Sequence, residues 1–182
     1  MLDEDASTEL QRCKSSPLPR QLFLAASRSR PQLEHGRRLV ADRYRGYVCI
    51  PPYAISTHPV TQGAYAVLMG GQPQKGEYMP NRPVLVSYME AAHFCNAMSE
   101  REGLSLCYEF SEENGRETVA WRNRSHCTGY RLPAVEEAAA YHRGTDNEWT
   151  WVTNTPSIDQ IEVHEGIPRG FYIARSLNRP RR

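Results

Sequence analysis

The side chains best suited to chemistry in this 182-residue chain are five cysteines, which stand at positions 13, 49, 95, 107 and 127. Thiolates and imidazoles bind copper or zinc when several of them converge with a suitable geometry. His93 and Cys95 are two residues apart on an expected helix, so they point in different directions. His126 and Cys127 are adjacent, and such a pair needs further ligands elsewhere. We therefore expect no metal site and no cofactor.

The cysteine pattern also bears on the cellular compartment. The five cysteines form an odd set without a C-x-x-C pair, which is more typical of reduced thiols in a cytosolic protein than of a disulfide scaffold. The chain begins Met1-Leu2-Asp3-Glu4-Asp5, which is acidic where a signal peptide is basic. No segment approaches the roughly 20 apolar residues that span a bilayer. We expect reduced thiols, a cytoplasmic location and no membrane partner.

Other catalytic arrangements find little support. A nucleophilic serine or cysteine needs a neighbouring base that a third group orients, and no local motif brings such groups together. Asp146, Glu148 and Asp159 could offer oxygens to Ca²⁺. Three scattered acids nevertheless fall short of the roughly six to eight ligands that this ion takes. The sequence therefore favours neither centre.

Charge gives only a local hint of a nucleic-acid partner. The net charge is +1, so no bulk field attracts nucleic acid or an anionic membrane. Arginines gather between Arg28 and Arg45 and again in the tail at Arg179, Arg181 and Arg182. Acidic and apolar residues interleave with the first group, which favours a solvated loop over a binding arm. Nucleic acid is therefore the partner that we rank last.

The elements before residue 70 follow from turn residues and periodicity. Short strands are expected at 47–50 and 53–55, separated by prolines that cannot donate to a β-ladder. Thr61 can cap a helix in which Tyr65, Leu68 and Met69 share one face. Two glycines then end this helix.

A second, longer helix is expected after residue 86. Ser87 and Glu90 have the spacing of a capping box. The core face of the helix is expected to consist of Ala91, Phe94, Cys95 and Met98. Segments 106–110 and 118–121 alternate like the arms of a hairpin around the turn Asn114-Gly115. Pro133 is expected in the first turn of a further helix, and 170–175 is expected as a closing strand.

Two stretches of the sequence carry a resemblance to a known family. They are Pro83-Val84-Leu85-Val86-Ser87-Tyr88-Met89-Glu90-Ala91-Ala92-His93-Phe94-Cys95-Asn96-Ala97-Met98-Ser99 and Gly129-Tyr130-Arg131-Leu132-Pro133. Together they resemble the core of the formylglycine-generating-enzyme (sulfatase-modifying factor) family, which has a C-type-lectin-like fold. Weaker matches run in the family's order over roughly residues 20–176.

The resemblance implies a fold and a division of the chain. The fold would be α+β, with short twisted antiparallel strands, two or three flanking helices and many loops. A flexible lead-in at 1–19 would precede the domain at 20–177, and a basic tail would follow at 178–182. The matched positions that would build this scaffold are Ser87, Glu90, Cys95, Asn96, Arg131 and Pro133.

Departures from the family pattern bear on activity. Active formylglycine-generating enzymes carry an R-G-G-S-type segment followed by a cysteine pair that binds copper and activates oxygen. This chain has no cysteine after Cys127. It also has only three residues between Gly144 and Glu148, where the family carries several tens. The resemblance therefore implies a non-catalytic member rather than an oxidase.

The same resemblance points to a region for ligand binding. In C-type-lectin-like folds the late part of the chain borders the ligand surface, and here it alternates polar and aromatic residues. The candidate ligand-binding residues are Asp146, Asn147, Trp149, Trp151, Asn154 and Tyr172. Aromatic side chains give rigid contact area, which suits binding. Trp149 and Trp151 also lie at strand spacing, so we expect at least one of them in the core.

Three functions remain open at this point. The first is a module that binds a ligand or, more specifically, another protein, as an accessory subunit or a retroelement-diversified variable protein. The second is a metal-dependent oxidase or sulfoxide-synthase-like enzyme with a relocated active site. The third is a nucleic-acid-binding accessory protein, whose affinity would fall steeply with salt. The missing cysteine pair favours the first.

Overall fold

The fold is seen in a computed structural model, which describes residues 33–35, 39–42, 46–50, 52–71, 77–113, 115–121, 127–134, 136–138, 150–151 and 170–177. The expected lead-in at 1–19 and tail at 178–182 lie outside these residues, and the division into segments stays a prediction. In chain order the elements are β1 (Leu33–His35), β2 (Leu39–Asp42), β3 (Gly46–Cys49), β4 (Tyr53–Ser56), α2 (Gln62–Met69), α3 (Tyr88–Arg101), β5 (Tyr108–Glu113), β6 (Arg116–Trp121), β7 (Tyr130–Arg131), β8 (Thr150–Trp151), β9 (Gly170–Phe171) and β10 (Ala174–Ser176).

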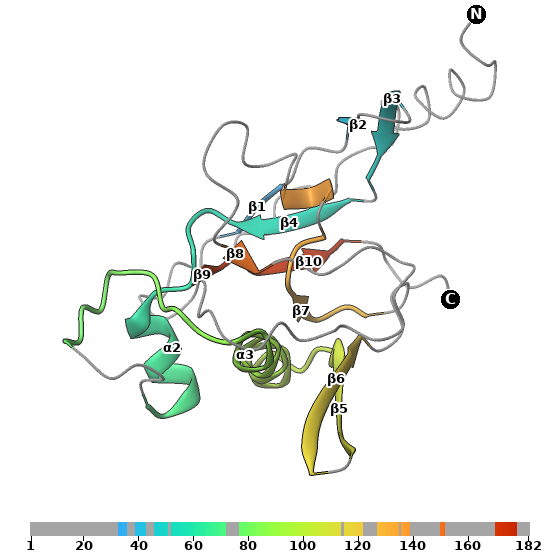
Figure 1. Cartoon of the computed structure of the whole chain (residues 1–182). Helices are drawn as coiled ribbons and strands as arrows, with labels where there is room; N and C mark the ends of the chain where they lie inside the picture. The colour runs from blue at the N-terminus through green and yellow to red at the C-terminus, as the bar shows by residue number, and fades with distance from the viewer. Residues whose placement is uncertain are drawn as a thin grey trace, which may run out of the picture.

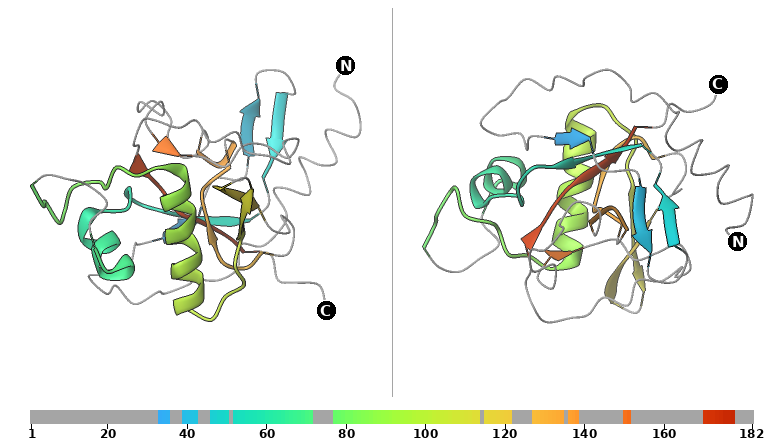
Figure 2. Two further views of the ribbon diagram at one scale, coloured as in Figure 1. Left: turned by 60° about the horizontal axis from the view of Figure 1, so that its bottom comes forward. Right: turned by 90° about the horizontal axis from the view of Figure 1, so that it is seen from above.

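A four-stranded sheet in the order β1-β4-β10-β7 forms the centre of the described structure. All of its neighbouring strands are antiparallel. Figure 1 shows α2, α3 and the β5–β6 hairpin along one side of this sheet, with α3 in contact with the other two. The β2–β3 hairpin lies away from α2, toward the opposite end of the molecule (Figure 2). This arrangement is the α+β fold that the resemblance implied.

The closing strand expected at 170–175 is divided into β9 and β10. Between the two halves, the N–H of Ile173 donates to the side-chain oxygen of Ser56 in β4 at 3.1 Å, and the carbonyl of Ile173 accepts the backbone N–H of Ser56 at 2.8 Å. The connection between the two halves is therefore held against β4, although the halves pair with different strands. β10 joins the central sheet, while β9 pairs with β8.

The β8–β9 pair is parallel, with Thr150 opposite Gly170 and Trp151 opposite Phe171. This pair departs from the antiparallel strands that the resemblance implied, whereas the neighbouring strands of the central sheet agree with them. Parallel neighbours need a crossover connection of about a dozen residues or more. The chain between Trp151 and Gly170 is long enough to provide it.

α3 begins and packs as its sequence predicts. The side chain of Ser87 accepts the N–H of Glu90 at 3.2 Å, and the carboxylate of Glu90 accepts the N–H of Ser87 at 2.7 Å. This reciprocal pair is the predicted capping box. All four residues of the expected core face are buried: Ala91, Phe94, Cys95 and Met98. Phe94 packs against Phe171 of β9, with ring centroids 5.4 Å apart.

α2 confirms its predicted cap but only part of its predicted face. The side chain of Thr61 accepts the N–H of Ala64 at 3.2 Å, and Gly70 ends the helix. Tyr65 is buried and stacks on Phe94. Met69, however, is exposed, because it falls in the last turn and extends beyond the side of the helix that α3 covers.

The β5–β6 hairpin turns at the predicted place. Glu113 pairs with Arg116, which leaves a two-residue turn, and Gly115 has a φ of +76° that glycine adopts without strain. The first strand begins at Tyr108, two residues later than expected. The reason is Asn96 of α3, whose side-chain oxygen accepts the N–H groups of Cys107 and Tyr108 at 3.2 and 3.1 Å. Asn96 therefore fixes the start of the hairpin.

An exposed pair also joins the hairpin to α3. The ring of His93 stacks on Phe110 of β5, with centroids 3.7 Å apart. Its Nε2 atom lies 3.0 Å from a carboxylate oxygen of Glu117 in β6. Both side chains are substantially solvent-accessible, so we expect this ion pair to contribute little to stability.

Candidate functional site

The predicted ligand-binding region meets the described structure at β8 and β9. Trp151 lies in β8, beside Phe171 of β9, but its side chain is outside the described part of the structure. Asp146, Asn147, Trp149 and Asn154 also lie outside the described residues. The backbone pairing therefore locates one candidate, Trp151, at an edge of the fold. A role in binding for any of these five residues stays a prediction.

Tyr172 is the one candidate whose side chain is described. It follows β9, is half-buried, and packs against a small cluster made of Ile50, Tyr53 and Ile55. Burial raises the pKa of its phenol above the ordinary value, so the group stays neutral at physiological pH. Tyr172 thus joins β9 to a secondary core and can present only part of its ring to a ligand.

Most of the exposed apolar side chains lie on α2 and on the connection that follows it. Among the described residues, the exposed large hydrophobic side chains are Val67, Met69, Tyr78, Leu85 and Leu106. All but Leu106 belong to α2 or to the connection from α2 to α3. The N–H of Gln62 donates to the carbonyl of Arg82 at 2.8 Å, which holds this connection against the start of α2. The carbonyl of Val84 borders β9, since it would lie 4.0 Å from a Cβ atom added to Gly170. Leu85 is the next residue in the chain.

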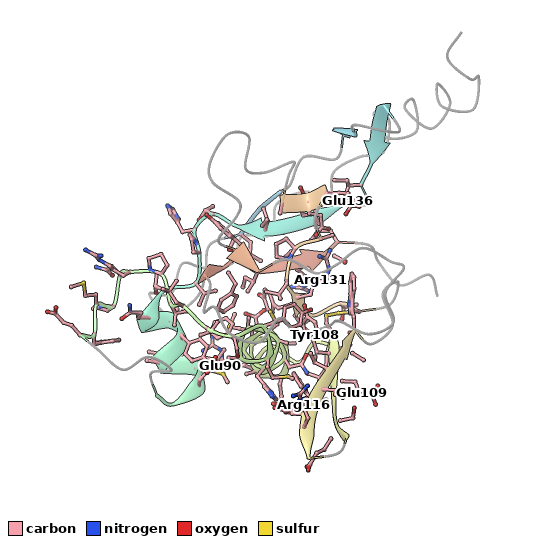
Figure 3. The ribbon with its side chains drawn as sticks, in the orientation of Figure 1. Glu90, Tyr108, Glu109, Arg116, Arg131 and Glu136 are labelled. Atoms are coloured by element: carbon pink, nitrogen blue, oxygen red, sulfur yellow. A yellow bond between two sulfur atoms is a disulfide. The ribbon has the colours of Figure 1, made fainter. Side chains whose placement is uncertain are left out.

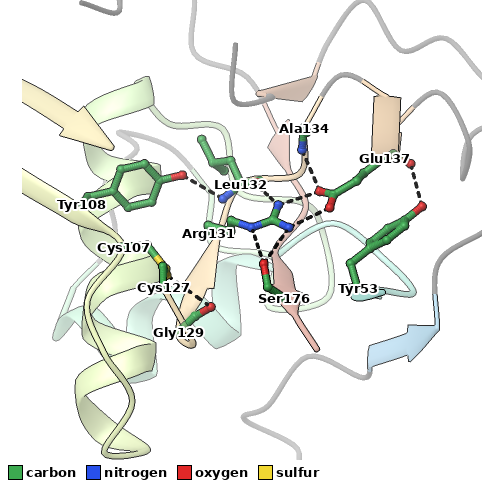
Figure 4. A network of polar contacts seen from close by, with 10 residues as sticks. All are labelled: Tyr53, Cys107, Tyr108, Cys127, Gly129, Arg131, Leu132, Ala134, Glu137 and Ser176. Atoms are coloured by element: carbon green, nitrogen blue, oxygen red, sulfur yellow. Dashed lines mark hydrogen bonds and ion pairs between the residues drawn. A yellow bond between two sulfur atoms is a disulfide. The ribbon is translucent and has the colours of Figure 1, made fainter. Parts of the chain in front are cut away.

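The Gly129–Pro133 signature builds a buried ion pair. Arg131 of β7 and Glu137 are 5% and 4% exposed. The guanidinium donates to both carboxylate oxygens of Glu137, at 2.6 and 2.7 Å (Figure 4). Burial alone would lower the pKa of Arg131, but the hydrogen bonds and charge of Glu137 outweigh burial and raise it. Arg131 is therefore a permanent cation inside the fold.

Further hydrogen bonds connect this ion pair to several strands. Arg131 also donates to the hydroxyl of Ser176 in β10 at 3.2 Å. The hydroxyl of Tyr53 in β4 donates to the backbone carbonyl of Glu137 at 3.2 Å. The N–H of Leu132 donates to the hydroxyl of Tyr108 at 2.9 Å. Figure 3 shows Arg131 and Tyr108 near the centre of the molecule, whereas Glu109 lies on the outer side of the hairpin. These hydrogen bonds connect several strands to one another, so the network has a structural role and not a catalytic one.

Pro133 precedes the cap of the helical segment that follows it and does not lie in the first turn, where it was expected. The N–H of Ala138 donates to the carbonyl of Ala134 at 2.9 Å, which makes Ala134 the residue that caps the short helical segment at 136–138. The carboxylate of Glu137 accepts the N–H of Ala134 at 2.8 Å. Pro133 is therefore the residue before the cap, and the expectation that it lies in the first turn of the helix is wrong. An alanine cap has no side-chain oxygen, so Glu137 supplies half of a capping box.

Two of the cysteines contradict the expectation that all five are reduced thiols. Cys107 and Cys127 form a disulfide, with Cα atoms 5.3 Å apart. The hairpin that separates them in sequence brings its two ends together, which the sequence pattern did not reveal. Cys95 keeps a free thiol that is fully buried, and burial raises its pKa far above the ordinary value. A neutral, inaccessible thiol is a poor nucleophile and a poor metal ligand.

The residues present do not fit the copper centre that active relatives carry. Within the described ranges, no group of three or more histidine, cysteine, aspartate or glutamate side chains is arranged to hold a metal ion. The cysteine pair expected after an R-G-G-S-type segment has no counterpart beyond Cys127 in the sequence. The three cysteines whose side chains are described, Cys95, Cys107 and Cys127, are enclosed in the core or joined in a disulfide.

Comparison with known proteins agrees with this architecture. The family model of the sulfatase-modifying factor enzyme 1-like domain matches residues 32–166, and the chain belongs to that family. Its α+β fold is the formylglycine-generating-enzyme-like, C-type-lectin-like fold. No curated protein matches the chain.

Two solved structures are similar to the chain. The structure of CarF is 15% identical, with a TM-score of 0.54, and the match covers 82% of this chain and all of CarF, which bears on the fold alone. Variable protein 1 of Treponema denticola is 25% identical, with a TM-score of 0.43 over 63% of this chain. This chain spans about half of that protein, since the match covers 52% of it.

Across the described ranges, neither helix has the length and apolar character needed to cross a bilayer.

Proposed function

We propose that this chain is a non-catalytic binding module on a formylglycine-generating-enzyme-like scaffold, and that its partner is another protein. The state of the cysteines carries this proposal. The one described free thiol is enclosed in the core, two further cysteines are joined to each other, and no cysteine follows residue 127. The thiol chemistry of active relatives therefore has no candidate residues among those described.

The scaffold has instead been kept intact. The capping box of α3, the Asn96 contacts to the hairpin and the Arg131–Glu137 ion pair all position backbone, and none of them offers an open reactive group. A family member that retains these contacts while lacking the copper ligands is suited to display a surface. This retention favours binding over a relocated active site.

A direct assay tests the absence of catalysis. Purified protein is incubated with copper, oxygen and a cysteine-containing sulfatase peptide, and the peptide mass is followed. We expect no formylglycine above the level in a protein-free control, because the chain lacks the thiolates that would bind copper. Conversion of the peptide in proportion to protein concentration would contradict the proposal.

The exposed residues of α2 and of the connection to α3 offer a surface for the partner. Exposed apolar side chains that gather in one region commonly mark interaction sites. Leu85 is 44% exposed and follows Val84, whose carbonyl lies near Gly170 of β9, the strand that pairs with the candidate binding segment at Trp151. A partner with an apolar contact surface would cover Leu85 and its neighbours.

Leu85→Asp tests this surface. A partner is first isolated from the native host and purified, and its affinity is then measured against the wild type and two variants. We expect Leu85→Asp to weaken binding by about tenfold or more, because a charge would be buried in an apolar contact. The matched control is Leu106→Asp, which has a similar exposure of 37% but lies in the loop before β5.

The affinities of the two variants decide where the partner binds. Unchanged affinity for Leu106→Asp together with a loss for Leu85→Asp supports the surface. Equal effects of the two variants, or no effect of either, would place the partner elsewhere. Circular dichroism spectra of both variants check that the fold is retained.

A further inference from the structure

We propose that the Cys107–Cys127 disulfide is a redox-dependent staple, and that the domain reaches full stability only where these two thiols are oxidised. The disulfide joins the residue before β5 to a residue shortly before β7. It closes a loop that contains the whole β5–β6 hairpin, across a sequence separation of 20 residues. A crosslink of this length stabilises a protein mainly by restricting the unfolded chain.

Non-covalent contacts bring the two cysteines together. The N–H of Thr128 donates to the hydroxyl of Ser105 at 2.8 Å, and the two hydroxyls lie 3.0 Å apart. The N–H of Tyr130 donates to the hydroxyl of Ser99 at 2.7 Å. These contacts hold segment 127–130 against the end of α3 and the loop that follows it. The cysteine pairing therefore agrees with the hydrogen bonds around it.

The fold also limits what can approach the cysteines closely. Gly129 lies so near the chain before β5 that a Cβ atom there would overlap with the carbonyl of Ser105 and the hydroxyl of Ser99. Cys107 is fully buried and Cys127 is 6% exposed. Once the disulfide has formed, a reductant can reach it only after this part of the domain opens. We therefore expect the oxidised state to persist in the native protein.

Formation of the bond is ordinary thiol–disulfide exchange. The thiolate of one cysteine attacks a sulfur of a small-molecule or protein disulfide, and one thiol of that oxidant is released. The thiolate of the second cysteine then attacks the mixed disulfide and releases the other thiol. The two cysteines lose two protons and two electrons in total, and the oxidant is reduced to two thiols.

This proposal departs from the cytoplasmic location that the cysteine pattern favoured. Cytosolic glutathione and thioredoxin keep most protein thiols reduced. A staple of this kind is useful where the surroundings are oxidising. The non-catalytic function uses the same bond as one of its observations, but the two proposals fail separately: reduced thiols at Cys107 and Cys127 would overturn the staple, whereas conversion of the sulfatase peptide would overturn the non-catalytic function.

Peptide mapping tests whether the bond exists in the native host. Cells are lysed in N-ethylmaleimide to block free thiols, and the purified protein is digested with trypsin without reduction. Cleavage after arginine gives the peptide 102–116, which contains Cys107, and the peptide 125–131, which contains Cys127. We expect the two peptides as one disulfide-linked species. Recovery of both as separate maleimide adducts would overturn the proposal.

Thermal unfolding tests whether the bond acts as a staple. Reduction of the wild type should lower Tm by about 6–12 °C, as expected for a loop of this size in a chain of this length. The variant C107A/C127A should show a similar loss and no further response to reductant. The control C13S/C49S should keep the full response of the wild type. An unchanged Tm on reduction would overturn the proposal, and this measurement on the wild type remains decisive if the alanine variant does not fold.

Discussion

Replacement of Arg131 by methionine should lower the free energy of unfolding by about 3–5 kcal/mol, measured by urea denaturation. The substitution removes one partner of an ion pair whose two members are almost fully buried. The carboxylate of Glu137 would stay in the core with the N–H of Ala134 as its remaining described hydrogen-bond donor. A buried charge without its counterion costs more than the intact pair contributes.

A second variant separates the buried charge from lost packing. In R131M/E137L both charges are replaced by apolar groups of similar size, so we expect the double variant to be less destabilised than R131M. The exposed His93–Glu117 pair is the matched control, and Glu117→Gln should cost no more than about 1 kcal/mol. If R131M were as mild as Glu117→Gln, the buried pair would not have the central role assigned to it.

Replacement of Gly129 by alanine should destabilise the domain by about 3 kcal/mol, at the upper end of the range for overpacking. The added Cβ would overlap with the hydroxyl of Ser99, and more severely with the backbone carbonyl of Ser105, which cannot rotate away. The segment from Cys127 to Tyr130 would have to move off α3. Loss of its hydrogen bond from Tyr130 to Ser99 would follow.

Gly71→Ala provides the comparison for this prediction. No atom lies within 4 Å of a Cβ at that position, so the substitution should leave the urea midpoint nearly unchanged. An equally small effect of Gly129→Ala would mean that the 127–130 segment is not closely packed against α3. The same result would weaken the argument that this packing brings Cys107 and Cys127 together.

Local features of the sequence predicted much of the secondary structure. The Ser87–Glu90 spacing and the helical repeat of α3 identified both its start and its buried face. Asn114-Gly115 identified the turn of the hairpin. Each of these features involves residues within a few positions of one another. The interactions that stabilise it lie within a single helix or hairpin.

Contacts between distant parts of the chain were harder to predict. Arg131 and Glu137 belong to no local motif that pairs them, and nothing in their spacing showed that the two would form a bidentate pair. Ser176, which accepts from the same guanidinium, is 45 residues from Arg131. Ion pairs are usually found at the surface, and this one is structural because both partners are buried. Burial depends on the assembled fold and not on local sequence.

The candidate binding site was predicted less completely than the scaffold. Tyr172 lies half-buried against Ile50, Tyr53 and Ile55, so it supports the edge of the fold at least as much as it borders a ligand. The exposed residues on the connection that follows α2, such as Leu85, were not recognised from the sequence. An exposed leucine in a strand-like segment has the same local signature as a buried one.

The sequence by itself determined the family, the starts of α2 and α3, the turn of the hairpin and the absence of a cysteine pair after residue 127. Only the tertiary structure decided that Cys107 and Cys127 are joined, that Arg131 is neutralised by Glu137, and that β8 and β9 run parallel. The physical reason is the same in each case. Local backbone preferences select the elements, but pairing across the fold depends on where burial and chain connection bring those elements together.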